Sequence, residues 1–324
     1  MKDEAIDCDF EELRAYQYSE DREMWTGLEA EREAASKLGV GAAFSYEVPL
    51  PFESRGLRFD RQGQFHPRKY LLHLARMIPG FGSHVFEHTP VIEIQPGSPC
   101  RVLTERGMVR ARHVVTAIHS PFESPVLQTK VASYRSYVLA LRMAEGVEPP
   151  PGLFWDTEEP YHYIRGHRTG RGPLLIVGGE DRKTGSEEDT TPHFDALLEF
   201  ATRRFKVASV VNRWSAQVIE PFDGLPFIGR DLATPDLYVA TGFSGTGLTS
   251  GTLAAMINSD LILGRANPYQ DLYDPRRLNL KASVLDMVKQ GLEFPVRLVG
   301  GMLTPAQVAW REAEKSAGKR RVAS

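Results

Sequence analysis

Apolar residues recur with the spacing of a helix in three segments, 20–38, 67–78 and 191–205. The first helix is expected to end at Gly39, because a glycine readily adopts the left-handed conformation that closes a helix. Pro67 suits the first turn of the second helix, where its missing N–H would have no partner. One face of that second helix collects the apolar residues Tyr70, Leu71, Leu74, Met77 and Ile78.

Between these helices the pattern is that of strands. The runs 114–118 and 237–241 are continuously apolar, which is typical of strands buried on both faces of a sheet. The longer strands expected between residues 134 and 217 are half polar and indicate a second sheet, with Gly107 marking a separate hairpin. The pattern therefore predicts an α/β plus antiparallel-β arrangement in which neither domain is one continuous segment.

A glycine-rich loop, "GFSGTGLTSG", follows the run 237–241 and leads into a helix of small and apolar residues. Its glycines allow the backbone to approach a ligand closely, and a hydroxyl of Thr249, Ser250 or Thr252 could cap the helix. The first amides of such a helix attract negative charge from a phosphate, a carboxylate or a ring oxygen. A loop that only packs the helix tightly against a sheet is the alternative, and loop chemistry alone leaves both open.

The spacing Gly245-x-Gly247-x-x-Ser250 is close to the dinucleotide fingerprint, but its surroundings are not. A Rossmann unit needs a second parallel strand soon after the helix and an acidic residue about 20 residues beyond the loop. Here the helix is expected to end at Gly264 and to lead into the polar, proline-containing "RANPYQDLYDPRR". We therefore do not expect this loop to hold a pyrophosphate, and an NAD(P)-binding module is disfavoured.

Composition excludes several other classes of protein. The chain has 324 residues, of which 42% are hydrophobic and 25% charged, as in an ordinary globular protein. Its net charge of −3 argues against a nucleic-acid partner, and the basic run 315–321 is expected to be a solvated tail. With two cysteines and nine scattered histidines, neither a disulfide framework nor a metal site is expected.

The beginning of the sequence, "MKDEAIDCDFEELRAYQ", is acidic and lacks the apolar stretch of a signal peptide. No run approaches the roughly 18 apolar residues of a membrane span. We expect a cytoplasmic protein that acts on a small molecule, while its oligomeric state is left open.

Several motifs together resemble one family. "DGLPFIGR" at 223–230, followed by "LYVATGFSGTGLTSGTLAAMINSDLI", is similar to the C-terminal flavin-binding signature of the D-amino-acid oxidase superfamily. That superfamily includes glycine oxidase, sarcosine oxidase and γ-glutamylputrescine oxidase-like proteins. Supporting matches are "GQFHPRKYLLHLA", "VFEHTPVIEI", "ARHVVTAIHSP", "FWDTEEPYHYIR" and "GGEDRKTG". The resemblance covers roughly residues 15 to 277 and is greatest to the branch that often carries a C-terminal Rieske domain.

The resemblance implies a fold and its domains. It implies an α/β protein in which a partial FAD-binding (glutathione-reductase-like) domain is interleaved with a mixed, largely antiparallel β-sheet substrate domain. The FAD-binding domain would comprise 63–125 and 223–277, and the substrate domain 1–62 and 126–222. Residues 278–324 would form a C-terminal helical tail.

The resemblance also implies site residues. The backbone around the glycine loop would face the edge of the flavin ring that gains negative charge on reduction. The expected FAD-binding residues are Val91, Thr116, Ala117, Gly245, Thr246, Gly247, Leu248 and Thr249. The expected substrate-binding residues are Tyr161, Tyr163, Arg165 and Phe243. Arg165 is the candidate for binding a carboxylate or other anion, the alternative being a surface arginine on a half-exposed strand, and no catalytic base is singled out.

The chain also departs from the family pattern. No GxGxxG motif precedes Gly63, so the N-terminal Rossmann βαβ segment is expected to be missing, and no CxH…CxxH pair of a Rieske domain is present. Thr246 occupies a position where sarcosine-oxidase-like members often have histidine, and "PLLIVGGE" lacks the lysine that some oxidases use with oxygen. No cysteine lies near Gln217 for a covalent link, so FAD would be non-covalent.

The expected function is that of an FAD-dependent oxidoreductase. It would oxidise an amine or amino acid by hydride transfer to the flavin, and the imine would then hydrolyse in a deamination. The alternative is a truncated, non-catalytic remnant, or a mis-started fragment, of such an enzyme. The sequence leaves the amine and the electron acceptor open.

Overall fold

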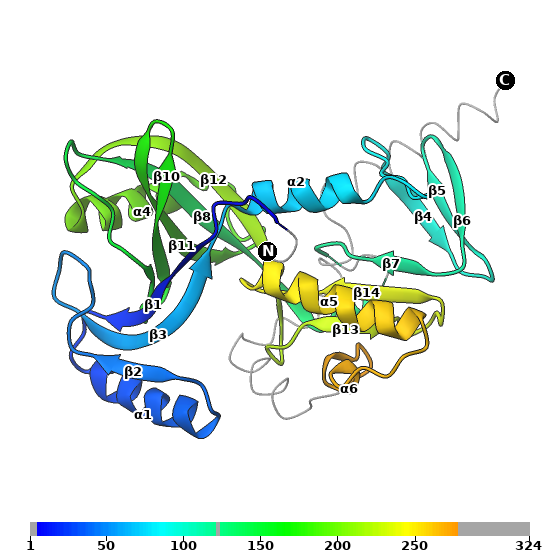
Figure 1. Ribbon diagram of the computed structural model, residues 1–324, viewed down its shortest axis with the longest axis horizontal. Coiled ribbons are helices and arrows are strands. Elements are labelled where there is room, and N and C mark those ends of the chain that lie inside the picture. Colours follow the sequence, from blue (N-terminus) through cyan, green and yellow to red (C-terminus); the bar gives the residue numbers. More distant parts are fainter. Residues whose placement is uncertain (1–4, 121–123, 278–324) are drawn as a thin grey trace. The chain divides into compact units, whose positions relative to one another are not determined.

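The computed structural model describes residues 5–120 and 124–277, and these fall into two compact units (Figure 1). Unit 1 combines Met1–Phe86 with Tyr134–Gln217, and unit 2 combines Glu87–Ser133 with Val218–Ser324. Each unit therefore draws on two separate stretches of sequence. The tail predicted over 278–324 lies outside the described residues, and the domain boundaries drawn from the resemblance remain a prediction.

Unit 1 is built on an eight-stranded sheet with the order β12-β8-β11-β10-β9-β1-β3-β2. Its strands are β1 (Glu11–Ser19), β2 (Ala42–Ser45), β3 (Arg55–Gln64), β8 (Val131–Met143), β9 (Leu153–Asp156), β10 (His162–Thr169), β11 (Gly172–Lys183) and β12 (Val207–Pro221). Its helices are α1 (Met24–Lys37), α2 (Pro67–Met77) and α4 (Thr191–Arg204). Neighbouring strands pair antiparallel from β8 to β9, whereas β1 pairs parallel with β9.

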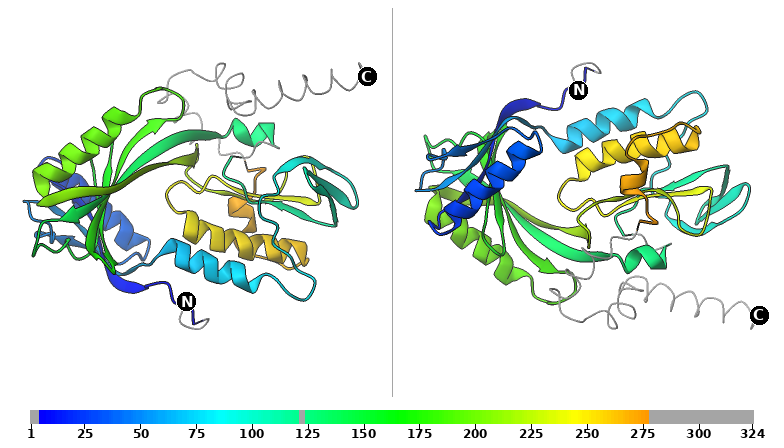
Figure 2. Two further views of the ribbon diagram at one scale, coloured as in Figure 1. Left: turned by 90° about the horizontal axis from the view of Figure 1, so that it is seen from above. Right: turned by 90° about the horizontal axis from the view of Figure 1, so that it is seen from below.

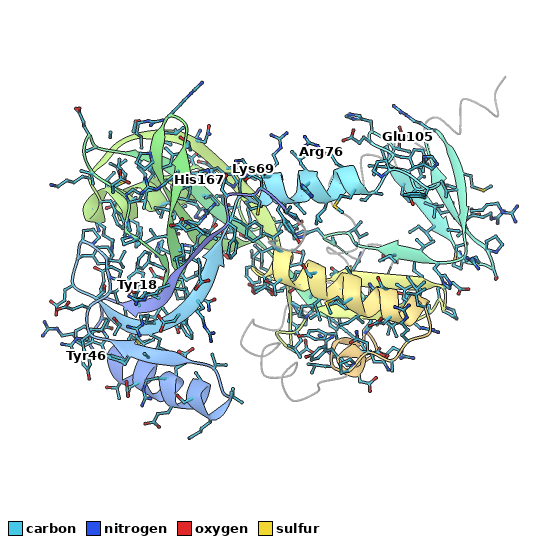
Figure 3. The ribbon with its side chains drawn as sticks, viewed as in Figure 1. Tyr18, Tyr46, Lys69, Arg76, Glu105 and His167 are labelled. Atoms are coloured by element: carbon cyan, nitrogen blue, oxygen red, sulfur yellow. The ribbon has the colours of Figure 1, made fainter. Side chains whose placement is uncertain are left out.

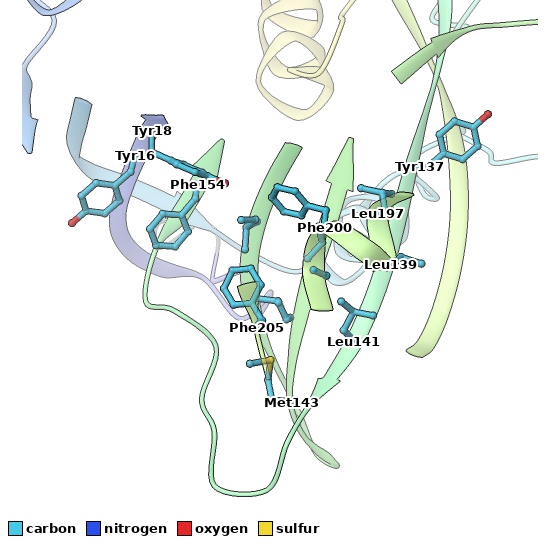
Figure 4. Close-up of a cluster of buried hydrophobic side chains, with 14 of the residues drawn as sticks. Tyr16, Tyr18, Tyr137, Leu139, Leu141, Met143, Phe154, Leu197, Phe200 and Phe205 are labelled. Atoms are coloured by element: carbon cyan, nitrogen blue, oxygen red, sulfur yellow. The ribbon is translucent and has the colours of Figure 1, made fainter. Parts of the chain in front are cut away.

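The main core of unit 1 lies between one face of this sheet and α4 (Figure 4). Ile164 of β10 and Leu175 of β11 are buried there together with Leu197 and Phe200 of α4. Because side chains alternate along a strand, the residues next to Ile164 on β10 point to the opposite face of the sheet. Because Ile164 packs against α4, the opposite face of β10 is the one available for other contacts.

Unit 2 contains two three-stranded sheets, with the orders β13-β14-β7 and β4-β5-β6. The strands are β4 (Val91–Gln95), β5 (Cys100–Thr104), β6 (Gly107–Ala111), β7 (Val114–Thr116), β13 (Phe227–Arg230) and β14 (Leu237–Thr241). The helices are α3 (Pro125–Gln128), α5 (Gly247–Ile262) and α6 (Gln270–Tyr273). Helix α5 runs along β13 and β14 (Figures 1 and 2), burying Ala254 and Ile257 against Ile228 and Ala240.

The structure confirms most of the predicted elements and corrects some. Helices form over all three amphipathic segments, and Gly39 has the expected positive φ of 75°. The run 114–118 gives only the short strand β7, in which Val115 is 44% exposed, because β7 is the last strand of its described sheet. Helix α2 also has none of its residues buried, although its apolar face is well formed.

An ion pair braces the start of β13 in unit 2. Arg277 donates to both oxygens of Asp223, with Nε 2.7 Å from Oδ2 and Nη2 2.8 Å from Oδ1. Its guanidinium also donates to the backbone carbonyls of Leu225, Pro226 and Tyr273 and lies over the Phe227 ring at 4.0 Å from the centroid. Burial alone would raise the pKa of Asp223, but the bonds and charge of Arg277 outweigh it and lower that pKa. The aspartate of "DGLP" is therefore a structural residue here.

Replacing Asp223 is expected to leave the buried Arg277 charge without its partner. The two side chains are only 6% and 12% exposed, so Asp223→Asn should lower the free energy of unfolding by about 3 kcal/mol in urea denaturation. Because the folded-state pKa is lowered, the pair stabilises the fold above the unfolded pKa of about 3.9 and loses this effect as pH falls through the folded pKa. The difference in free energy of unfolding between the wild type and Asp223→Asn should therefore become smaller at acidic pH.

The exposed Asp271→Asn serves as the matched control and should stay within about 0.5 kcal/mol of the wild type. A loss below about 1 kcal/mol for Asp223→Asn, unchanged with pH, would contradict the brace.

Candidate functional site

Two parallel strands bring separate parts of unit 2 to one sheet edge. β14 pairs parallel with β7, with Val239 opposite Thr116. The Thr116 hydroxyl donates to the Tyr238 carbonyl at 3.1 Å, and the Thr241 hydroxyl donates to the His119 carbonyl at 2.9 Å. Since the carboxyl ends of parallel strands lie at the same edge, β7 leads there into Ala117 and β14 leads there into the glycine loop.

The loop after β14 is held in a fixed turn. Gly242 has φ of +73°, and a Cβ there would lie 2.7 Å from Cγ of Pro221, so no other residue fits without displacement. Ser244 has φ of 46°, and its amide donates to the Ile219 carbonyl at 3.0 Å. Phe243 packs against the cluster formed by α5, β13 and β14. Both sides of the turn are thus tied to the sheet.

Helix α5 begins without a side-chain cap. Its N-cap residue is Thr246, whose hydroxyl donates to the Phe243 carbonyl at 2.8 Å instead of receiving a helix amide. The predicted caps Thr249, Ser250 and Thr252 are wrong, because the helix starts at Gly247 and these residues lie inside it. In the described part of the chain the amides of Gly247, Leu248 and Thr249 consequently have no hydrogen-bond acceptor.

The space beside these amides is open. A Cβ built at Gly245 or at Gly247 meets no atom within 4 Å, and the first turn of α5 holds no acidic residue. Asn258 donates to the Val239 carbonyl at 3.2 Å and so fixes the helix against β14. Unpaired amides with the positive end of the helix dipole suit an electron-rich ring edge or an anion. These residues therefore fit the edge of a flavin ring.

A second group of predicted residues lies on β10 or, for Tyr161, one residue before it in unit 1. Tyr163 is paired with Gly178 of β11, and a Cβ at Gly178 would lie 2.1 Å from Cζ of Tyr163, so the tyrosine ring covers this glycine. The rings of Tyr161 and Tyr163 are 6.1 Å apart. Burial raises the pKa of Tyr163, which keeps its hydroxyl protonated. The two tyrosines form one aromatic surface on the face opposite Ile164.

Arg165 carries a half-buried charge on the same face. Its Nη1 donates to Oε1 of Gln64 at 3.3 Å, and no carboxylate of the described residues forms an ion pair with it. Burial lowers the pKa of Arg165, a sign that its charge is poorly compensated. His167, labelled in Figure 3, lies two residues further along β10 and contacts the His66 ring at 5.6 Å. Sequence reasoning missed Gln64 and His167, although the two-residue spacing 163, 165, 167 was visible.

The remaining predicted residue is separate from both groups. Val91 begins β4 in the other sheet of unit 2, where it is paired with Thr104 and is 44% exposed. Across residues 5–120 and 124–277, no cluster of His, Cys, Asp or Glu side chains is arranged to hold a metal ion. In the same residues, no helix is long and apolar enough to cross a membrane.

Comparison with known proteins defines the class of protein. A solved glycine oxidase from Geobacillus kaustophilus has a similar fold, with a TM-score of 0.73, 18% identity, and coverage of 85% of this chain and 77% of that one. The model of the FAD dependent oxidoreductase family, DAO, matches residues 1–261. The chain therefore belongs to the DAO family of FAD dependent oxidoreductases, and the predicted fold class, family and cofactor are confirmed.

Two curated relatives show how far the similarity extends. The putative Rieske 2Fe-2S iron-sulfur protein YhfW of Bacillus subtilis is 29% identical, over 98% of this chain and 63% of its own length. The γ-glutamylputrescine oxidoreductase of Escherichia coli is 23% identical, over 83% of this chain and 66% of its own length. The chain thus spans less than two thirds of the Bacillus relative.

Filling the open space beside α5 should block the flavin without harming the fold. A Cβ added at Gly245 meets no atom within 4 Å, so Gly245→Val should unfold within about 0.5 kcal/mol of the wild type. The same side chain would occupy the space beside the free amides, so flavin absorbance should no longer co-elute with the variant on gel filtration. Gly251→Ala, one turn further into α5, should retain flavin. Full flavin retention by Gly245→Val would contradict this placement of the ring.

Proposed function

We propose that this chain forms part of an FAD-dependent oxidoreductase that oxidises an amine or amino acid and releases an imine for hydrolysis. The observation that carries the proposal is the edge where β7 and β14 end, with its unpaired amides at the start of α5. Family membership supports the cofactor, and the names of the relatives, glycine oxidase and γ-glutamylputrescine oxidoreductase, support the substrate class.

Each group of residues has a distinct part in this proposal. Bound FAD would accept a hydride from the carbon next to the substrate nitrogen. The amides of Gly247, Leu248 and Thr249 would donate hydrogen bonds to the flavin ring edge, where they stabilise negative charge at no cost in reorganisation. Thr116 and Ala117, at the same sheet edge, would contact the ribose and pyrophosphate, and Val91 the adenine. FAD would be bound without a covalent link.

The face of β10 would bind the substrate. Tyr161 and Tyr163 offer an aromatic surface for its apolar part. Arg165, held by the neutral amide of Gln64, would bind an anionic group of the substrate. An amino acid carries such a carboxylate, whereas a simple amine does not, and this difference gives a direct test.

Arg165→Gln should therefore separate amino acids from amines. The probes are glycine, sarcosine and proline, each paired with the amine that lacks only its carboxylate: methylamine, dimethylamine and pyrrolidine. For an amino acid that reduces the flavin under anaerobic stopped flow, the variant should bind roughly 10- to 100-fold more weakly, because a charge-assisted hydrogen bond contributes about 1.5–3 kcal/mol. Binding of the matching amine should not change.

The control is Arg168→Gln, whose side chain is 81% exposed on the same strand. Arg168→Gln should change neither the binding of the amino acid nor the binding of its matching amine. Equal weakening of an amino acid and its amine by Arg165→Gln would show that Arg165 does not bind a carboxylate. No flavin reduction by any of the six probes would contradict the proposed substrate class itself.

A further inference from the structure

The end of β11 departs from regular strand geometry. Its pairing with β8 shifts register between Gly179 and Arg182, which marks a bulge over residues 180 and 181. Gly179 has φ of +134°, and a Cβ there would lie 2.1 Å from the Tyr161 carbonyl oxygen. Glu180 has φ of 53°, a conformation that side chains disfavour. Bulges of this kind re-aim side chains and are over-represented beside active sites.

The bulge sends its two acidic side chains to different neighbours. Glu180 lies with Oε1 3.4 Å from Nε2 of His162, and His162 stacks on Phe200 of α4, so Glu180 is on the core side. Asp181 instead lies near Tyr161, Tyr163 and Ser136. The second carboxyl therefore belongs with the tyrosines proposed to bind the substrate.

Asp181 lacks a complete set of partners. Its Oδ1 is buried without a hydrogen-bond partner in the described structure. Buried polar atoms without partners are rare and costly, so this oxygen indicates a place for a further donor. Burial raises the pKa of Asp181, whereas hydrogen bonds between its carboxyl and the hydroxyls of Ser136 and Tyr161 lower that pKa. The charge of Glu159 adds to the rise, and that of Arg182 reduces it. Tyr163 and Tyr137 are the other titratable groups in its field.

We propose that Asp181 receives the substrate's ammonium group and takes up one of its protons, an inference that rests on the proposed function. In this step an N–H bond of the bound ammonium breaks and an O–H bond to the Asp181 carboxylate forms. The electron pair of the broken bond stays on nitrogen, so the bound amine becomes neutral and Asp181 becomes a neutral acid. A nitrogen lone pair is needed for oxidation of the adjacent carbon to an imine. A carboxyl in a buried place is a better proton acceptor than an exposed one.

The test compares Asp181→Asn with Asp181→Glu in the flavin-loaded protein, using dimethylamine and sarcosine under anaerobic stopped flow. In the wild type, the rate of flavin reduction should rise with pH and level off above the pKa of Asp181. In Asp181→Asn the rate at pH 7 should fall by about 100-fold or more. It should then recover about tenfold per pH unit towards the amine's own pKa of about 10, because the solution now supplies the neutral amine. Asp181→Glu should restore part of the rate.

A stability measurement distinguishes this role from a structural one. Because folding raises the pKa of Asp181, its charged form destabilises the fold at high pH, so Asp181→Asn should melt at or above the wild-type Tm at pH 8 and lose this advantage near pH 4. The exposed Asp195→Asn should match the wild type in both measurements. If Asp181→Asn kept the wild-type pH profile, or melted below the wild type at pH 8, the proposed role of Asp181 would be wrong. The proposed function would not be affected by that result. Absence of flavin reduction in the wild type would overturn the proposed function and, with it, this role.

Discussion

The parallel pairing of β7 with β14 is the constraint on which the candidate flavin site depends. These strands are more than a hundred residues apart in sequence, yet hydrogen bonds from Thr116 to Tyr238 and from Thr241 to His119 tie their carboxyl ends together. The turn at Gly242 then directs the chain into α5, whose first amides stay unpaired. Without this pairing the loop would be a glycine-rich turn with no second element beside it.

In unit 1, the alternation of side chains along β10 is the constraint that positions the candidate substrate-binding residues. On one face His162 is held between Asp156, 2.8 Å from Nδ1, and Glu180, and it stacks on Phe200 with 4.0 Å between ring centroids. Anchoring this face against α4 fixes the opposite face, which presents Tyr163 and Arg165. Gly178 must lack a side chain so that Tyr163 can lie over it. The core contacts of the strand thus determine where its polar groups point.

The sequence was sufficient for the parts of the fold that repeat regularly. The apolar run 237–241, the glycine loop and the amphipathic helices all form where the pattern places them. Strand β1 was missed, because "EELRAYQYS" is rich in charge and becomes a strand only through pairing with β3 and β9. The cap of α5 was placed wrongly, since hydroxyls at four nearby positions make the choice depend on the turn itself.

The chemistry of individual side chains was harder to read from sequence. Arg165 was expected from the resemblance, but its neutral partner Gln64 lies about a hundred residues earlier and no spacing links the two. Asp181 was not singled out, because a bulge cannot be recognised from the letters "GGED". Register shifts and unpaired atoms are properties of the folded sheet, and they decide which acids and bases have special environments.

Hydrogen exchange of the amides of Gly247, Leu248 and Thr249, measured with and without FAD, tests the central claim most directly. We expect these amides to exchange markedly more slowly when FAD is bound, because they then donate hydrogen bonds that are absent in the free protein. Helix α1, in the other unit, supplies an internal reference whose exchange should not change. Unchanged exchange at Gly247, Leu248 and Thr249, in a sample from which FAD demonstrably co-elutes with the protein, would contradict the placement of the flavin edge at the start of α5.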